Sequence, residues 1–342
     1  MTREPLTLVG NAKGGTISVL RLHEGELVPL LTNSVGAGCS TFAVDAARGL
    51  VYSATTAPTP AIITLTLDAA TGELAEIART DIPDALAYLT LSREGTLLLG
   101  ASYHGGWGAV WPITEGTVGE ATARVEYANL HCVITDPAGL HAYFVSLGAG
   151  LIAQYELDAD GRLAPLSPST VAAPEGSGPR HLILGGAGTD AYLVTEYSGE
   201  VIRYARDRSS GVLTAQEVLE VFDPTIGLKH SRFGADPRAE HLIWGADLHL
   251  ARDERYLLAS ERSGSTVATV ELDEGGVLGR VVALWSTEQQ PRGFGVAPDG
   301  VAVVVAGEAS GAVALGTVDP DGSVTPRQRV ETGAGPNWVR FA

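Results

Sequence analysis

The chain has 342 residues, of which 45% are hydrophobic and 18% charged, and it contains 42 glycines but one methionine. This composition can supply a core and argues against disorder, and its glycine content favours tight turns over long helices. The formal net charge of −17 argues against non-specific binding to nucleic acid or anionic membranes, although a local arginine cluster could still bind a small anion.

The N-terminus, MTREPLTLVG, lacks the apolar run of a secretion signal, and no stretch of 18 apolar residues occurs. Two cysteines, Cys39 and Cys132, are few for this length and have neither CxxC nor zinc-site spacing. We therefore expect a cytoplasmic protein that binds neither membranes nor nucleic acid and is a monomer or a weak homo-oligomer.

One short pattern recurs along the chain, with apolar residues on either side of a turn made of acidic residues, small residues and glycine. In chain order the copies are LHEGEL (22–27), LDAATGEL (67–74), ITEGTV (113–118), LDADGRL (157–163), RDRSSGVL (206–213), LDEGGVL (272–278) and VDPDGSV (318–324). Each copy predicts a β-hairpin, because Asp and Gly readily adopt the backbone conformations of such turns.

The spacing of these turns indicates a closed ring. The equivalent glycines lie 47, 44, 45, 50, 65 and 46 residues apart, and they are Gly25, Gly72, Gly116, Gly161, Gly211, Gly276 and Gly322. The 20 residues after the last glycine and the 25 up to the first together make one more period. A repeat that closes through its own termini predicts a circular array.

Each unit also contains two apolar runs joined by a polar turn, such as HCVITDPAGLHAYFVS (131–146), which makes four strands of a propeller blade. NWVRFA (337–342) reads as an inner strand whose partners lie in residues 6–22, so both ends share one blade and no sheet edge is left open. We predict an all-β, seven-bladed propeller in a single domain, residues 1–342. It lacks the WD and GH signatures of WD40 repeats.

The 65-residue gap predicts an insertion at about 222–245, between the fourth and fifth units, on a face that often binds ligands. The leading residues of the inner strands should meet around the channel; they are His131, Arg180, His181, Asp247, His249, Arg292, Asn337 and Trp338. Second strands end at another matched set, namely Tyr103, Glu196, Glu261, Arg262 and Glu308. Convergent polar groups of this kind predict a pocket.

These residue types suit the opening or closing of a lactone. Attack by water needs a base such as His or Glu, the oxyanion needs fixed donors, and an anionic substituent suits arginine. The same set also fits a non-catalytic receptor, and GPRH or QPRGF could be structural corners. A metal site of His131, His249, Asp247 and Glu196 has no compact ligand spacing to support it. We expect no metal and no cofactor, and GxSxG, Walker and GxGxxG motifs in a βαβ context are absent.

Several longer motifs resemble the seven-bladed β-propeller lactonase family, most closely its bacterial 6-phosphogluconolactonase branch. They are EGSGPRHLIL, DAYLVTEYSGEVIRY, GADLHLARDERYLLASERSGSTVATVEL, QQPRGFGVAPDG and GAGPNWV. The resemblance covers nearly the whole chain and is strongest from about residue 129. It implies hydrolysis of 6-phosphoglucono-δ-lactone to 6-phosphogluconate in the pentose phosphate pathway. A fungal branch interconverts carboxymuconate and its lactone.

The fungal branch's His, Glu and two Arg correspond by resemblance to His131, Glu196, Arg180 and Arg262. We predict that His131 or Glu196 activates water and that Arg180 stabilises the oxyanion. Arg262, Arg292 and the insertion would hold an anionic, small lactone substrate. The substrate-binding set is completed by Tyr103, His181, Asp247 and His249, of which the last two orient the others.

The sequence departs from the family pattern in places, since the first two blades match weakly and CSTFAVD (39–45) lacks the expected proline. The insertion carries cations that could bind a phosphate or reshape the pocket for another lactone, namely Lys229, His230, Arg232, Arg238 and His241. Three alternatives therefore stay open: a carboxymuconate-type enzyme, a hydrolase of another sugar lactone, and a non-catalytic binding propeller.

Overall fold

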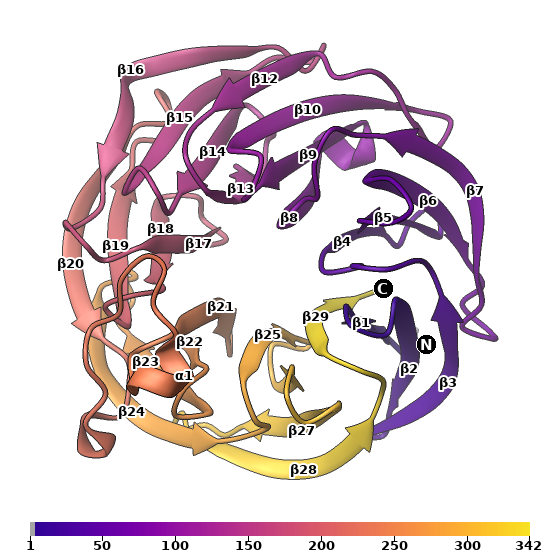
Figure 1. Cartoon of the computed structure of the whole chain (residues 1–342). Helices are drawn as coiled ribbons and strands as arrows, with labels where there is room; N and C mark the ends of the chain where they lie inside the picture. Colours follow the sequence, from indigo (N-terminus) through magenta and orange to yellow (C-terminus); the bar gives the residue numbers. More distant parts are fainter. Residues whose placement is uncertain (1–3) are drawn as a thin grey trace.

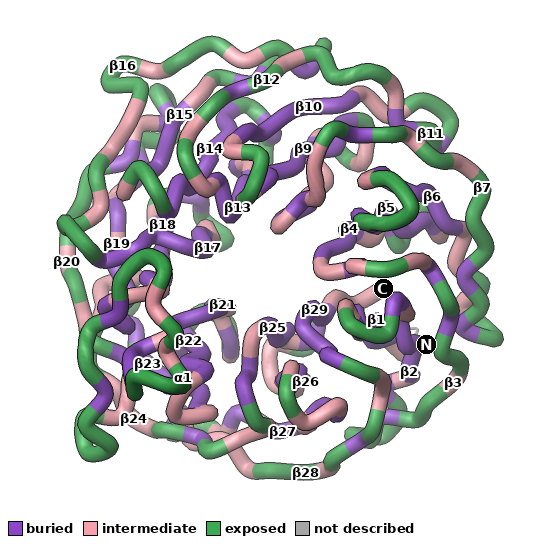
Figure 2. Tube along the Cα trace, viewed as in Figure 1, coloured by how far each residue is buried: buried purple, intermediate pink, exposed green. Residues whose placement is uncertain are grey.

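The computed structural model describes residues 4–342, and within them the strands form seven separate sheets around a central opening (Figure 1). Along each sheet the strands follow one another from the channel to the rim, and neighbouring strands are antiparallel. Figure 2 shows exposed segments gathered at the rim and buried ones further in. The prediction of an all-β, seven-bladed propeller is confirmed.

The two ends of the chain share one blade, as predicted. From the channel outward it contains β29 (Pro336–Phe341), β1 (Leu6–Asn11), β2 (Thr16–His23) and β3 (Glu26–Ser34). Val9 pairs with Val339, and the Leu6 amide donates to the Ala342 carbonyl at 2.8 Å. The termini accordingly lie close together in Figure 1, and the inner edge of this blade is closed by the last strand of the chain.

The other six blades follow in chain order. The first three are β4 (Phe42–Asp45), β5 (Leu50–Thr55), β6 (Ala61–Leu67) and β7 (Leu74–Asp81); β8 (Tyr88–Ser92), β9 (Leu97–Ser102) and β10 (Trp107–Thr114), with β11 (Thr117–Val118) and β12 (Ala123–Glu126) as an interrupted outer strand; and β13 (Leu130–Thr135), β14 (His141–Ser146), β15 (Leu151–Leu157) and β16 (Leu163–Ala172). The 3₁₀ turn η1 (Arg93–Gly95) joins β8 to β9.

The last three are β17 (Pro179–Leu184), β18 (Asp190–Thr195), β19 (Glu200–Arg206) and β20 (Leu213–Glu220); β21 (Gly245–Ala251), β22 (Tyr256–Glu261), β23 (Thr266–Leu272) and β24 (Leu278–Ser286); and β25 (Pro291–Val296), β26 (Ala302–Gly307), β27 (Ala312–Val318) and β28 (Val324–Glu331).

The repeated turns join the third and fourth strands of the blades. As the sequence predicted, Asp side chains stabilise these turns and Gly adopts a positive φ in them. The Asp68 carboxylate accepts from the amide of Ala70 at 2.7 Å, and Gly72 has a φ of +78°. A Cβ at Gly211 would lie 2.2 Å from the His141 ring, so this glycine is also required by close packing. His141 is consequently buried beneath a neighbouring blade's turn.

Neighbouring blades pack through aliphatic faces that merge into shared clusters. Val194 and Val201, for example, lie in one cluster with Leu248 and Leu257 of the next blade. Trp338 joins several inner strands, since its indole N–H donates to the Phe42 carbonyl at 2.9 Å and its ring packs edge-on against Tyr88 and His181. Inner strands of four blades are thus linked through one buried indole ring.

The predicted insertion runs between β20 and β21 and contains two short turns, η2 (Pro224–Ile226) and α1 (Pro237–Glu240). Asp223 and Asp236 cap these turns with their side chains. The insertion crosses the blade β21–β24 in Figure 1, and the Ser263 hydroxyl of that blade donates to the Leu242 carbonyl at 2.7 Å. None of the helices in residues 4–342 is long and apolar enough to cross a membrane.

Candidate active site

A cavity of about 440 Å³ opens where the inner strands begin and the second strands end. Its lining comes from several blades and from the insertion. The residues are Gly38, Ser40, Thr56, Ala85, Leu86, Ala87, Tyr103, His104, His131, Arg180, Glu196, Trp244, Arg262 and Arg292. Residues up to 254 positions apart in the chain thus meet in one small space because each blade begins at the same ring.

Glu196 is held between two arginines. It follows β18 directly, and its Oε2 accepts from Arg180 Nε at 2.8 Å and from Arg262 Nη2 at 2.9 Å. Its side chain is 15% exposed, whereas those of Arg180 and Arg262 are 2% and 3% exposed. Burial would raise the pKa of Glu196, but the charges of Arg262 and Arg180 outweigh burial and lower its pKa. Glu196 is therefore ionised at neutral pH.

Arg180 is fixed from behind by a chain of buried groups. One of its Nη1 protons faces His181 Nε2 at 3.1 Å, and Nη1 also donates to the Ala246 carbonyl. His181 Nδ1 lies 2.7 Å from Asp247, whose other oxygen lies 3.4 Å from His249 Nε2. Burial and the charge of Arg180 lower the pKa of His181 to about 4, so His181 is neutral and can accept from Arg180.

The insertion holds the second arginine. Trp244 stacks on the Arg262 guanidinium, whose Cζ lies 3.8 Å from the ring centroid, and the Trp244 carbonyl accepts from Arg262 Nε at 3.2 Å. The Trp244 amide in turn donates to Glu261 at 2.7 Å. Burial lowers the pKa of Arg262 to about 9, which still leaves this arginine charged at neutral pH.

A third arginine completes the charge balance of the cavity. Arg292 Nη1 donates to Glu308 at 3.2 Å, and Gln290 holds the other Glu308 oxygen at 2.6 Å. The side chain of Arg292 is 34% exposed, which makes it the most accessible of the three. Among the residues that line the cavity, the three arginines outnumber the single carboxylate, Glu196, so the lining favours an anion.

His131 supplies an uncharged nitrogen base to the cavity. It is 6% exposed, and its Nδ1 is buried without a hydrogen-bond partner among residues 4–342. Burial, followed by the positive charge of Arg180, lowers the pKa of His131 well below its ordinary value. The Tyr103 ring lies edge-on to it, with centroids 5.7 Å apart. Because Nδ1 is shielded from solvent, Nε2 is the nitrogen of this neutral imidazole that can accept a proton from a water in the cavity.

The two most buried arginines each keep one nitrogen for a ligand after the internal hydrogen bonds are counted. Among the described residues, Arg180 Nη2 and Arg262 Nη1 donate to no protein acceptor, although the other nitrogens of both groups are engaged. Rigid, charged N–H groups beside a neutral base are the arrangement that stabilises an oxyanion formed by attack of water on a carbonyl.

The structure brings six of the predicted site residues into the lining of one cavity, namely Tyr103, His131, Arg180, Glu196, Arg262 and Arg292. His181, Asp247 and His249 lie behind Arg180 and do not line the cavity. Glu261 is 2% exposed and binds the amides of Trp244, Ser263 and Gly264.

The predicted cations of the insertion, Lys229, His230, Arg232, Arg238 and His241, are all exposed and line no part of this cavity. The insertion contributes Trp244 instead. Our sequence reasoning missed Trp244 and His104, although both adjoin predicted positions, since Trp244 ends the insertion before β21 and His104 follows Tyr103.

The alternative metal ligands do not form a cluster. In residues 4–342 no group of three or more His, Cys, Asp or Glu side chains is placed to hold a metal ion. Cys39 and Cys132 are both free and buried. Burial raises the pKa of Cys39 to about 11 and that of Cys132 to about 12, so neither is a thiolate at neutral pH.

Comparisons with known proteins agree with this geometry. The family described as "Lactonase, 7-bladed beta-propeller" matches residues 6–341. A 6-phosphogluconolactonase of Sodalis glossinidius is 29% identical over 271 residues, which is 78% of each chain. One of Cronobacter sakazakii is 27% identical over 280 residues, 81% of this chain and 80% of the other.

A solved structure extends the match to the whole fold. The Pseudomonas aeruginosa protein described as a periplasmic gluconolactonase superposes with a TM-score of 0.87 at 25% identity, covering 99% of each chain. Since the family matches nearly every residue and the seven blades are present, the resemblance inferred from the sequence is confirmed, and this chain belongs to the seven-bladed β-propeller lactonases, hydrolases of cyclic esters.

Proposed function

We propose that the chain opens the lactone ring of a sugar acid that carries an anionic group, with 6-phosphoglucono-δ-lactone as the best-fitting substrate. The observation that carries this proposal is the pairing of a neutral, unpartnered His131 with two arginines that each keep a free N–H. The excess of arginines in the cavity lining and the similarity to two bacterial 6-phosphogluconolactonases support the phosphorylated sugar lactone.

The reaction proceeds in two steps. His131 accepts a proton from water as the water oxygen attacks the lactone carbonyl carbon, and the carbonyl oxygen, now an anion, accepts from Arg180 Nη2. The ring C–O bond then breaks, and the ring oxygen leaves as an alcohol after taking the proton from His131. The product is the open-chain acid.

Glu196 has a different role from His131 in this scheme. Glu196 Oε2 accepts from both Arg180 and Arg262, so this carboxylate serves the arginine pair. It keeps Arg180 and Arg262 charged and in place, so that the arginines meet the developing oxyanion without rearrangement. Arg292, the most exposed cation of the site, binds the anionic substituent together with Arg262 Nη1.

A substrate panel tests this proposal. Acid release would be followed for 6-phosphoglucono-δ-lactone, glucono-δ-lactone and carboxymuconolactone, with spontaneous opening subtracted. The proposal requires the highest kcat/KM for the phosphorylated lactone and a selective rise of its KM in Arg292→Met. Preference for carboxymuconolactone would assign the aromatic-acid alternative, and tight binding of all three without turnover would assign a receptor.

Three expectations from the sequence accompany this proposal. We propose that residues 1–342 fold as one domain, that the chain is a monomer or a weak homo-oligomer, and that it works in the cytoplasm. The periplasmic description of the Pseudomonas aeruginosa relative makes cell fractionation the necessary check on location.

A further inference from the structure

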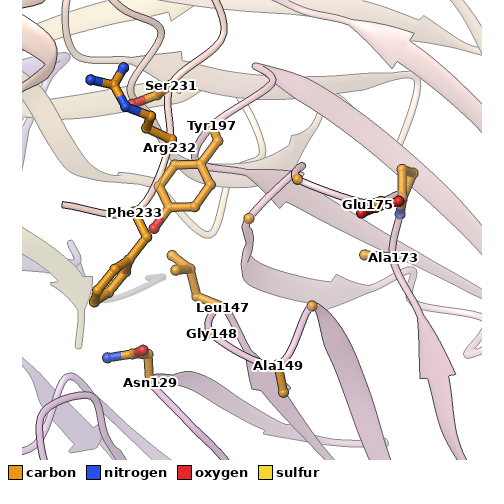
Figure 3. Close-up of a pocket in the computed structure, with 14 residues that line it drawn as sticks. Asn129, Leu147, Gly148, Ala149, Ala173, Glu175, Tyr197, Ser231, Arg232 and Phe233 are labelled. Carbon is orange, nitrogen blue, oxygen red and sulfur yellow. The ribbon is translucent and has the colours of Figure 1, made fainter. Parts of the chain in front are cut away.

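A second cavity, of about 730 Å³, lies beside the candidate active site and plays no part in the scheme above (Figure 3). Loops of the blades β13–β16 and β17–β20 form it together with the insertion. Its lining residues are Asn129, Leu147, Gly148, Ala149, Gly150, Ala173, Pro174, Glu175, Gly176, Gly178, Tyr197, Ser231, Arg232 and Phe233.

Two aromatic rings form one wall of this cavity. Figure 3 shows Tyr197 and Phe233 on the same side, with Glu175 on the opposite side. Phe233 is 67% exposed, although an exposed phenyl ring is costly in water. Tyr197 packs across Gly178, where an added Cβ would lie 2.6 Å from the tyrosine ring. The wall is therefore fixed on the tyrosine side and open to solvent on the phenylalanine side.

Two exposed lining positions carry no side chain. A Cβ at Gly148 would lie 2.4 Å from Asn129 Oδ1 and 2.9 Å from the Ala128 carbonyl, so only glycine fits there. Gly176, in the left-handed region with a φ of +72°, adds a second position without a side chain. Aromatic faces beside positions without side chains leave room for a ring-shaped ligand.

The charges of the lining disfavour an anion. Arg232 is the single cation among the lining residues, and it is paired with Glu240 at 2.6 Å. Glu175 is exposed and has no ion pair among residues 4–342. The remaining polar groups are the Asn129 amide, the Ser231 hydroxyl and the Tyr197 hydroxyl, which suit hydroxyl groups as partners.

The cavity adjoins the active site along the chain and in space. Tyr197 follows Glu196, and Gly178 lies two residues before Arg180. Asn129 precedes His131 by two residues, and its Nδ2 donates to the Tyr103 carbonyl at 3.3 Å. Residues that border the second cavity are thus direct neighbours of residues that line the first.

We propose that the second cavity binds a neutral sugar ring attached to the lactone, which extends the substrate class to lactones of disaccharide aldonic acids. The apolar face of the sugar lies on Phe233 and Tyr197, and its hydroxyls bind Glu175 and Asn129. The inference rests on the proposed lactone hydrolysis and deepens it, because the insertion then selects for a glycosyl substituent.

Filling the cavity tests this proposal. Ala149 is exposed in the β14–β15 loop, so Ala149→Trp should block the sugar site without affecting the core. Ala159, also exposed, lies in the β15–β16 turn at the other end of the same strand, so Ala159→Trp is the matched control. We expect Ala149→Trp to lower kcat/KM for lactobiono-δ-lactone roughly tenfold or more. Turnover of glucono-δ-lactone should stay unchanged, and Ala159→Trp should resemble the wild type for both lactones.

A binding measurement separates failure of this inference from failure of the proposed function. Saturation-transfer NMR with lactose as the probe should give a signal for the wild type that Ala149→Trp abolishes. Turnover of glucono-δ-lactone together with no lactose signal and equal kinetics in Ala149→Trp would overturn the sugar site and leave lactone hydrolysis standing. Lactose binding in an enzyme that opens none of these lactones, 6-phosphoglucono-δ-lactone included, would overturn the hydrolysis and, with it, this role of the cavity.

Discussion

Replacing Glu196 by glutamine should destabilise the propeller more than any exposed charge change. The substitution keeps the shape of the side chain but removes the charge that two buried arginines share at 2.8 and 2.9 Å. Breaking a buried ion pair by removing one partner costs about 3–5 kcal/mol. An unfolding entropy of about 2.1 cal/mol/K per residue gives roughly 0.7 kcal/mol/K for a chain of this length, and hence a fall in Tm of about 4–7 °C.

The pH dependence of this fall in Tm shows whether it comes from the lost charge of Glu196 or from a change in side-chain packing. Because the folded-state pKa of Glu196 lies below its ordinary 4.5, its contribution to stability is fully present above pH 4.5 and is lost as the pH falls through the folded-state pKa. The Tm difference between wild type and Glu196→Gln should therefore be largest at pH 7 and shrink below pH 4.5.

Thermal unfolding followed by circular dichroism measures both effects. The matched control is Glu76→Gln, which breaks the exposed Arg79–Glu76 pair and should change stability by about 1 kcal/mol or less. A Glu196→Gln variant that melts within 1 °C of the wild type at pH 7 would refute the inference that Glu196 neutralises the two buried arginines. So would a Tm difference that is equal at pH 7 and pH 3.5.

Three further predictions concern the site and the ring. Arg180→Ala should lower kcat by roughly 10²-fold or more in steady-state assays, since it removes an oxyanion donor, and normal turnover in a folded variant would refute that role. The pKa of His131 lies well below 6.5, so kcat/KM should stay level from pH 8 to pH 6. A fall in kcat/KM centred near pH 6.5 would contradict the role of His131 as a neutral, buried base. Deleting residues 333–342 removes β29 with Trp338 and should abolish cooperative unfolding in calorimetry, whereas an unchanged transition would show that ring closure is dispensable.

The architecture could be predicted because it repeats. Turn glycines such as Gly72 and Gly322 have positive φ values of +78° and +86°, as their place in an Asp–Gly turn requires, and their spacing alone counts the blades. Ring closure could be predicted because the residues after the last turn glycine and those up to the first together make one more period. The position of His131 and Arg180 at the start of inner strands likewise predicts that they meet at one mouth of the channel, and both line the cavity there.

The details of the site could not be predicted, because they depend on the direction of individual side chains and on their hydrogen-bond partners. The spacing of a repeat contains no information on either. Glu196 and Glu261 occupy matched positions at the ends of second strands, yet the first faces the cavity and the second binds three backbone amides. Basic residues of the insertion, such as Arg232, turned out to be exposed, because the insertion folds around its own capped turns and directs Trp244 inward. The spacing of hydrophobic residues and the residues of the turns predict neither the direction of the Glu261 side chain nor the exposure of the insertion's basic residues.

The decisive measurement is acid release from 6-phosphoglucono-δ-lactone by the wild type and by His131→Asn, each with and without a chelator. We predict rapid, chelator-insensitive opening of the lactone by the wild type and a loss of roughly 10²-fold or more in the variant, because a general base is removed. Equal rates in the two proteins would contradict the role of His131, and a wild-type rate no faster than spontaneous opening would contradict hydrolysis of this lactone at the arginine-lined cavity.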